Sequence, residues 1–383
     1  MTAANDPFAT VVAQALLETL PPARGAHRNR PMDGRKLLVF SDNRQDAAFI
    51  APNFERTSRD LAIRTAIRRV LAGGREVRFK ALADEVLAIL SDHGRRAPLA
   101  YDPLGREPRD ETELARELQG RVIAEFCGLS GRRLSLEGLG LVTVDLDSSV
   151  REPLLKELRR QLPPAVAAEA PALLRVLLAQ LRRDRVISDV PYIGHADEAV
   201  WGPRAGVRRI EKLRERKGDA GLFWLPSPER RQGNRRTALI AEAFGLDGEA
   251  ARAVLETIWS VLTNARFGAL ARGGVYAGNR GFVLDLTRLK VVDAAARPLL
   301  VCERCGLPQL DAVAGRCSAF GCGGEVVALD QEERLRLVTE NHYAHIYRYG
   351  RALLGLAREH TAAIATEARE RIASRYRDGR LNL

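Results

Sequence analysis

Lys36-Leu-Leu-Val-Phe-Ser-Asp-Asn-Arg-Gln-Asp-Ala-Ala48 is the stretch that decides the fold class of this chain. Residues 36–40 are β-capable and apolar after the lysine, which predicts a fully buried strand. Ser41 and Asp42 suit the N-cap of a helix that begins near Arg44. A buried strand that runs directly into a capped helix predicts the opening of a parallel βα unit.

A second strand and helix of this kind are expected at about 355–378. The helix from Glu367 to Tyr376 stops at Asp378-Gly379, where glycine commonly ends a helix. Arg380-Leu-Asn-Leu383 then begins an apolar stretch and the sequence ends. A domain does not normally stop on the first residues of a buried strand, so we expect the C-terminus to be truncated.

Four of the five cysteines form a cluster with the spacing Cys302-x2-Cys305-x11-Cys317-x4-Cys322. Two thiolate pairs on tight turns can close a tetrahedral shell around Zn²⁺, and the glycines beside them supply the turns. No histidine lies inside the cluster. The pattern therefore predicts a structural zinc ribbon, with buried or incidental thiols and a redox dithiol as the alternatives.

The stretch at 36–48 resembles motif IV of large bacterial superfamily 2 helicases of the DEAD/DEAH type that carry an inserted cysteine cluster. Asn341-His-Tyr343, Glu359-His-Thr-Ala362 and the helix ending Tyr376-Arg-Asp-Gly-Arg-Leu-Asn382 resemble motif IVa and the helix that follows it. The resemblance implies the start of the second RecA-like lobe of such an enzyme. The residues between the two pieces would then be an insertion whose ends lie close together.

The positive charge of the chain is concentrated in one segment. The formal net charge is +11, and residues 201–236 hold eleven Lys or Arg against four Asp or Glu. A local basic excess favours a polyanion such as nucleic acid, although a solvated arginine-rich surface has the same composition. The candidate phosphate contacts in this segment are Arg230, Arg231, Arg235 and Arg236.

Residues 237–292 have the order of a winged helix. A short helix (237–244), a turn at Gly245-Leu-Asp247 and a longer helix (248–262) precede an expected hairpin of 275–277 with 282–286. Asn279 and Arg280 lie at the tip of that hairpin, where a winged helix would reach DNA. Many small α+β insertions share this order.

The motifs that hydrolyse ATP are missing from the chain. The sequence contains no G-x-x-x-x-G-K-[ST] phosphate-binding loop. Asp197-Glu-Ala-Val200 and Gln232-Gly-Asn-Arg-Arg236 look like a Walker B acid pair and an arginine-finger motif, but neither occupies the position that the helicase order requires. We therefore expect no catalytic residue here, and ATP and Mg²⁺ only in the complete parent enzyme.

Two further groups of residues are candidates for contact with nucleic-acid phosphates. Ser41, Arg44 and Gln45 follow the first strand, at the end of a parallel sheet where ligands bind. His360 and Thr361 occupy the equivalent end of the next strand. The alternative role for both groups is to brace the lobe against the insertion.

The expected fold class is α/β with a mainly α insertion: a partial RecA-like parallel sheet, a winged-helix-like α+β segment and a zinc ribbon. The boundaries that we predict are 1–33 for an N-terminal helix and linker, 34–60 for the motif IV part, 61–236 for a helical insertion with the basic stretch, 237–298 for the winged-helix-like segment, 299–328 for the ribbon, and 329–383 for the return into the lobe up to motif IVa.

The expected function is that of a fragment of an ATP-dependent helicase or translocase, which grips the backbone and handles strands. Its partners would be nucleic acid, with DNA favoured over RNA, and the parent's first RecA-like lobe and motif V/VI segment. The alternatives are a non-enzymatic nucleic-acid-binding zinc protein and a protein-docking module of a defence or repair complex. No apolar run approaches the ~20 residues of a membrane span, so we expect no membrane partner and a cytoplasmic setting.

Overall fold

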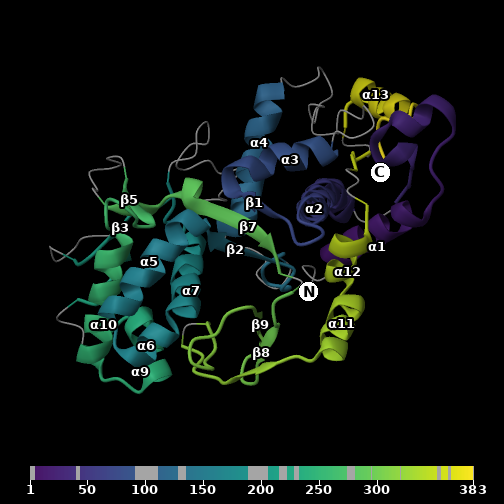
Figure 1. Ribbon diagram of the computed structural model, residues 1–383. Helices are drawn as coiled ribbons and strands as arrows, with labels where there is room; N and C mark the ends of the chain where they lie inside the picture. The colour runs from purple at the N-terminus through teal and green to yellow at the C-terminus, as the bar shows by residue number, and fades with distance from the viewer. Residues whose placement is uncertain are drawn as a thin grey trace. The chain divides into compact units, whose positions relative to one another are not determined.

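The computed structural model of this chain has a mixed α/β fold in which helices predominate and the sheets are small (Figure 1). It describes residues 5–39, 44–90, 111–127, 135–188, 206–214, 222–227, 233–273, 281–294, 296–319, 321–351, 355–360 and 364–382. Among the described helices, none combines the length and the apolar composition that crossing a bilayer requires. The general prediction of an α/β chain rich in helix is confirmed.

The chain divides into two compact units. Unit 1 consists of residues 1–70, 84–118 and 345–383, and unit 2 consists of residues 71–83 and 119–344. Unit 1 thus combines the beginning and the end of the sequence with a segment from within the predicted helical insertion. The boundary that the sequence suggested after residue 60 falls inside a continuous helix, because α2 (Arg44–Val70) runs through it.

Unit 1 is built around α2. Its other elements are α1 (Asn5–Thr19), the short 3-10 helices η1 (Gly25–Asn29) and η2 (Pro31–Gly34), α13 (Thr366–Arg377), the C-terminal part of α3 (Phe79–Leu90), the N-terminal part of α4 (Glu111–Cys127), and α12 (His342–Tyr349) from His345 onward. An ion pair between Arg59 and Glu117, with 3.0 Å between Nη1 and Oε1, joins α2 to the beginning of α4.

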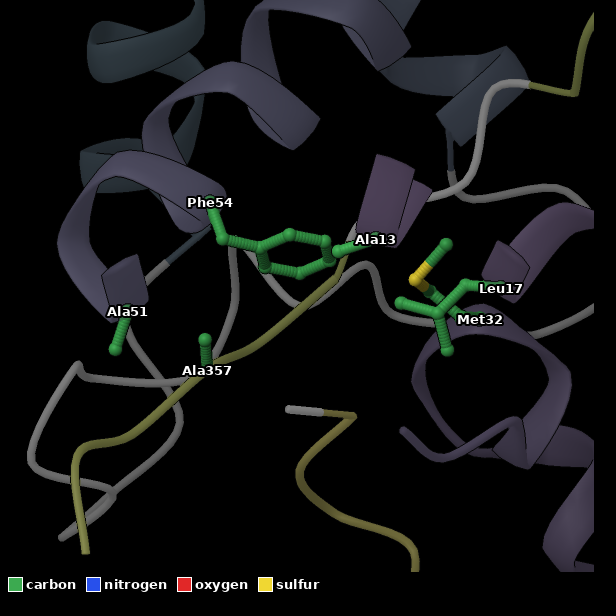
Figure 2. Packing of buried hydrophobic residues seen from close by; sticks show 6 residues of the cluster. All are labelled: Ala13, Leu17, Met32, Ala51, Phe54 and Ala357. Atoms are coloured by element: carbon green, nitrogen blue, oxygen red, sulfur yellow. The ribbon is translucent and has the colours of Figure 1, made fainter. Parts of the chain in front are cut away.

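The core of unit 1 surrounds the fully buried ring of Phe54 on α2. Figure 2 shows this ring among side chains from several elements. The labelled members of this core are Ala13, Leu17, Met32, Ala51, Phe54 and Ala357. The chain also passes Phe54 closely at Gly355, where an added Cβ would lie 2.6 Å from the ring and 2.8 Å from the sulfur of Met32. Glycine is therefore required at this crossing.

The side chain of Asn382 joins three stretches of unit 1. It is fully buried, and its Nδ2 donates to the carbonyl oxygens of Pro31 (2.9 Å) and Arg35 (2.7 Å). Its Oδ1 accepts from the backbone N–H of Leu356 (3.0 Å). Its own backbone accepts from the N–H of Leu37 (2.7 Å) and donates to the carbonyl of Leu356 (2.8 Å). Residues 37, 382 and 356 therefore lie side by side.

The predicted strands at 36–40 and from 355 onward are wrong for the residues described. Residues 35–39 and 355–360 are irregular. The N–H groups of Gly355, Leu356 and Ala357 donate to the side chains of Ser58, Asn382 and Glu55 respectively, not to a neighbouring strand. These backbone N–H groups donate to side-chain oxygens and are therefore not available to a neighbouring strand. The segments lie next to one another without forming a regular sheet.

The last turns of α2 are held against α12 within unit 1. Arg64 donates to the hydroxyl of the buried Tyr347 (3.0 Å), and Arg69 donates to the carbonyl oxygen of Gly350 (3.0 Å). Val70, where the chain leaves unit 1, and His345, where it returns for the last time, are therefore near one another.

In its described residues, unit 2 has two antiparallel three-stranded sheets, one mixed four-stranded sheet and helices that pack with them. Besides the remaining parts of α3, α4 and α12, its elements are β1 (Glu76–Arg78), β2 (Val142–Leu146), α5 (Ser148–Gln161), α6 (Pro164–Ala168), α7 (Ala170–Arg183), β3 (Ile210–Glu211), β4 (Leu222–Phe223), α9 (Arg235–Phe244), α10 (Gly248–Leu262), β5 (Leu270–Arg272), β6 (Phe282–Leu284), η5 (Leu286–Arg288), β7 (Leu289–Asp293), β8 (Leu300–Cys302), β9 (Pro308–Gln309), β10 (Val326–Ala328) and α11 (Gln331–Glu340).

A buried ion pair organises the centre of unit 2. The antiparallel sheet β1-β7-β2 packs with α7, whose buried face ends at Arg182. The guanidinium of Arg182 is 2% exposed; it contacts both carboxylate oxygens of Glu137 (3.0 and 2.8 Å) and donates to the carbonyl of Phe126 (2.7 Å). Although burial opposes ionisation of Glu137, Arg182 holds the pKa of that carboxyl below its usual value.

The helix pair α9–α10 agrees with the sequence expectation. Asn234 and Thr237 form a capping box at the start of α9, Gly245 ends that helix in the left-handed region (φ +63°), and Asp247 caps α10. After α10, β5 pairs with β6 in an antiparallel hairpin. The first strand of this hairpin lies at 270–272, ahead of the predicted 275–277. Residues 275–277 lie outside the part of the chain that the structure describes.

Replacing Asn382 by alanine should destabilise unit 1 by about 2–4 kcal/mol, because it leaves the buried N–H of Leu356 and the carbonyls of Pro31 and Arg35 without their partner. Urea denaturation measures the loss, and hydrogen exchange should show it as faster exchange in peptides covering 31–38 and 355–358.

Asn53→Ala is the matched control for this substitution. The Asn53 side chain accepts an exposed bond from Arg56, so its loss should cost no more than about 0.5 kcal/mol. Equal stability of the Asn382→Ala and Asn53→Ala proteins would contradict the joining role of Asn382.

Candidate metal centre

The four clustered cysteines lie on the sheet β10-β8-β9, which is antiparallel throughout, and on the turns that connect its strands. Cys302 is the last residue of β8, opposite Val326 of β10. The chain then turns back toward β9, with Cys305 in the turn. Gly306 follows in the left-handed region (φ +65°) and donates its N–H to the carbonyl of Cys302 (2.8 Å). This local geometry turns both side chains of the first pair to the same point.

A second turn carries Cys317 and Cys322. The N–H of Cys317 donates to the carbonyl of Gly324 (2.9 Å), and the N–H of Cys322 donates to that of Ala319 (3.0 Å). Gly324 has no room for a side chain, since an added Cβ would lie 2.7 Å from the sulfur of Cys302 and 3.4 Å from that of Cys322. The sequence reasoning missed Gly324, because only the folded turn reveals that two sulfurs pack against it.

The sulfur positions fit a tetrahedral metal site and not disulfides. All four sulfurs lie within 4.8 Å of one another, with 3.6 Å between those of Cys302 and Cys322 and 3.8 Å between those of Cys305 and Cys317. A disulfide requires about 2.05 Å. Four sulfurs each about 2.3 Å from a shared Zn²⁺ at the centre of a tetrahedron would be about 3.8 Å apart. The spacing therefore leaves room for an ion between the sulfurs.

Backbone amides aimed at the sulfurs change their acidity. Burial opposes ionisation of Cys302, but the N–H groups of Cys305 and Arg304 bring its pKa down to about 7. Burial raises the pKa of Cys317 to about 12, against the backbone N–H of Ala319 and the side-chain amide of Gln309. A divalent cation would hold such thiols as thiolates, which are its ligands.

The donor set identifies the ion that the site suits. Four thiolates in tetrahedral arrangement favour Zn²⁺ and leave no open position for water or substrate, which is the pattern of a structural site. An ion bound by the four cysteines would hold the two turns that carry them together. The prediction of a four-cysteine metal cluster is confirmed in its geometry.

A carboxylate outside the cysteine cluster connects the sheet β10-β8-β9 to the neighbouring parts of unit 2. Asp311 Oδ1 lies 2.6 Å from Nε of Arg175 on α7 and 2.5 Å from Nη2 of Arg297. The carboxylate therefore joins the loop after β9 to α7 and to the chain before β8. No pattern in the sequence pointed to Asp311, because its two partners are distant in the chain.

The structure assigns Arg236 to the interior, which corrects its prediction as a phosphate contact. Arg236 is 5% exposed, stacks over the ring of Trp224 (5.0 Å) and donates to the carbonyl of Phe223 (3.1 Å). Its burial lowers its pKa to about 10, against the effect of Asp184. A side chain enclosed in this way braces α9 and cannot reach a phosphate.

Among the other candidates for nucleic-acid contact, the structure describes the side chains of two. Arg235 is exposed at the start of α9, and His360 is exposed in unit 1. Arg44 and Gln45 begin α2, where only their backbone is described. The remaining candidates lie outside the described residues: Ser41, Arg230, Arg231, Asn279, Arg280 and Thr361.

Comparison with known proteins gives no family for this chain. No protein-family model, curated protein or solved structure matches it. The function has to be inferred from the residues themselves and from their geometry.

The purified chain should hold about one Zn²⁺ through the four clustered cysteines, by the tetrahedral spacing of their sulfurs. Elemental analysis of protein prepared without chelator measures this, and Cys305→Ala should abolish it. Cys127→Ala is the matched control: Cys127 is buried away from the cluster, and burial raises its pKa to about 12. Folded, metal-free wild-type protein would contradict the site.

Proposed function

We propose that this chain is the nucleic-acid-handling part of an ATP-dependent superfamily 2 helicase or translocase, with an inserted zinc ribbon. The observation that carries the proposal is the alignment of residues 37, 382 and 356 in unit 1. These are the segments whose sequences resemble the openings of successive strands of a second RecA-like lobe. The zinc ribbon lies between them in sequence, as the resemblance implies.

The backbone bonds in unit 1 support this reading in a specific way. A RecA-like lobe must bring strands that are separated in sequence into one sheet. The N–H of Leu37 reaches the carbonyl of Asn382, and the N–H of Asn382 reaches the carbonyl of Leu356. The order is thus 37, 382, 356, with the last segment in the middle. Two backbone hydrogen bonds thus connect the three segments in that order, without regular strands.

The course of the chain supports an insertion. Val70 and His345 are brought near one another by the contacts of α2 with α12 in unit 1. Most of the intervening residues form a compact unit of their own. Inserted domains leave and re-enter their host at neighbouring points.

The α9–α10 pair with the β5–β6 ribbon supports a winged-helix-like role for part of unit 2. Exposed basic side chains accompany it: Arg208, Lys212, Arg214 and Arg235. Arg214 also lies over the ring of Phe223 at 5.4 Å. Basic groups with an aromatic neighbour suit a nucleic-acid backbone, and we favour DNA over RNA as the partner.

In this proposal the residues of this chain bind and position the nucleic-acid backbone, and other segments of the parent enzyme hydrolyse ATP. ATP and Mg²⁺ would bind in the complete parent, with its first RecA-like lobe and its motif V/VI segment as partners. Arg44 and Gln45 at the start of α2 and His360 in unit 1 would contact phosphates. The zinc ribbon would keep the strand-guiding insertion rigid, in a cytoplasmic enzyme.

A second candidate is a non-enzymatic nucleic-acid-binding zinc protein. It is favoured by the cysteine geometry and the exposed basic residues of unit 2, neither of which depends on the helicase resemblance. A docking module for protein in a defence or repair complex would use the same ribbon without nucleic acid.

The chain alone should show no ATPase activity that nucleic acid stimulates, because its sequence has no phosphate-binding loop. A coupled assay with single strands and duplexes measures this. Turnover that Arg44→Ala removes would contradict the proposal that the catalytic parts lie elsewhere.

Binding to nucleic acid should be steeply salt-dependent and largely blind to sequence. Each phosphate neutralised contributes roughly −0.7 to −0.9 to the slope of log K against log[salt], so four to six contacts give about −3 to −5. Replacing Arg230, Arg231 and Arg235 together by glutamate should make the slope shallower by about 2 to 3. Fluorescence anisotropy at several salt concentrations measures both proteins.

A matched triple variant separates local contact from total charge. Arg159, Arg336 and Arg371 are exposed on α5, α11 and α13, and replacing them by glutamate changes the net charge equally. This control should keep the wild-type slope. Equal flattening by both triple variants would contradict a phosphate-tracking surface at 230–235, and absence of binding at low salt would favour the protein-docking module.

A further inference from the structure

Gln309 is a buried polar side chain beside the cysteine cluster. It ends β9, opposite Leu300 of β8, and is 6% exposed. Its amide Nε2 lies 3.5 Å from the sulfur of Cys317, within hydrogen-bond distance for sulfur. A buried amide is retained in an interior only where its donors and acceptor have partners, so this contact calls for an explanation.

The orientation of this amide is fixed by its other end. Oε1 of Gln309 accepts from the backbone N–H of Ser318 at 2.8 Å. A backbone N–H can only donate, so the oxygen must face Ser318 and the –NH2 group must face Cys317. The same residue therefore holds the turn after Cys317 with its acceptor and points a donor at the thiolate with its nitrogen.

A four-thiolate zinc centre needs such donors. Zn²⁺ with four thiolates carries a net charge of −2, and removing that charge from water is costly unless hydrogen bonds disperse it. The N–H of Ala319 gives one such bond to Cys317, at 3.4 Å. Gln309 adds a second donor to the same sulfur, and this one comes from a side chain that substitution can remove.

We propose that Gln309 is a positioning residue of the metal centre, an outer-shell donor that orients the Cys317 thiolate and slows loss of the ion. The proposal rests on the zinc site and does not depend on the helicase function. The competing explanation is that Gln309 only caps the turn at Ser318 and leaves the metal unaffected.

Two substitutions separate the donor from the cap. Gln309→Glu keeps an oxygen that can accept from Ser318, but it replaces the donor with a negative charge beside the thiolate. Gln309→Met keeps the length of the side chain and removes both functions. Gln331→Glu, on the exposed first turn of α11, is the matched control for the charge change.

The readouts are release of Zn²⁺ to a chromophoric chelator and the visible absorption of the Co²⁺-substituted protein, which reports tetrahedral thiolate coordination. Losing an outer-shell partner of a ligand typically weakens metal binding about 10–100-fold. We expect a loss in this range for both Gln309 variants, with Gln309→Glu at least as severe and with an altered Co²⁺ spectrum. Gln331→Glu should match the wild type.

Each contrary outcome has a definite meaning. Wild-type retention of Zn²⁺ in Gln309→Glu, with a loss only in Gln309→Met, would show that Gln309 is a cap alone and would overturn the proposal. Equal thermal destabilisation of the metal-free and metal-bound variants, with unchanged chelator kinetics, would also overturn it. Failure of the wild-type protein to bind Zn²⁺ or Co²⁺ would instead overturn the metal site itself.

Discussion

The buried amide of Asn382 is the interaction on which the organisation of unit 1 depends. It ties Pro31 and Arg35, near the beginning of the chain, to Leu356 near its end. Ser58 and Glu55 on α2 fix the next amides of the same returning segment. Because buried polar groups need partners, these hydrogen bonds hold the beginning and the end of the chain together in the same unit as the Phe54 core. The chain therefore leaves unit 1 at Val70 and returns to it for the last time at His345, near contacts that belong to unit 1.

The sequence predicted best those features that local chemistry determines. The cysteine spacing gave the metal cluster, and the capping residues Asn234, Asp247 and Gly245 gave the ends of α9 and α10. The sequence-based predictions failed where contacts between residues far apart in the chain determine the structure. Residues 36–39 look like a strand, but they are irregular, and the returning segment beside them bonds through the N–H groups of Gly355, Leu356 and Ala357 to side chains instead of to a neighbouring strand. Arg236 looks like a surface cation until Trp224 is found beneath it. Gly324 and Gln309 carry no signal, because their importance depends on where the sulfurs lie.

The metal centre and unit 1 are stabilised by different physical means. Unit 1 is held by an apolar core and side-chain hydrogen bonds, whereas the ribbon in unit 2 has short strands and little apolar burial of its own. A small sheet of that kind would gain rigidity from a bound ion. Asp311, between Arg175 and Arg297, joins it to α7. In the proposed helicase, such an insertion would present a stable face to a strand while the RecA-like lobes move.

The central claim is that the chain works within a larger ATP-driven enzyme, and the transcript that encodes it tests this most directly. Sequencing that transcript on both sides of the coding region shows which segments accompany residues 1–383. The account predicts an open frame upstream that encodes a G-x-x-x-x-G-K-[ST] loop with Walker B acids, and one downstream that encodes an arginine-finger motif. A transcript that encodes these 383 residues as a free-standing protein, with neither motif in a flanking frame, would contradict it.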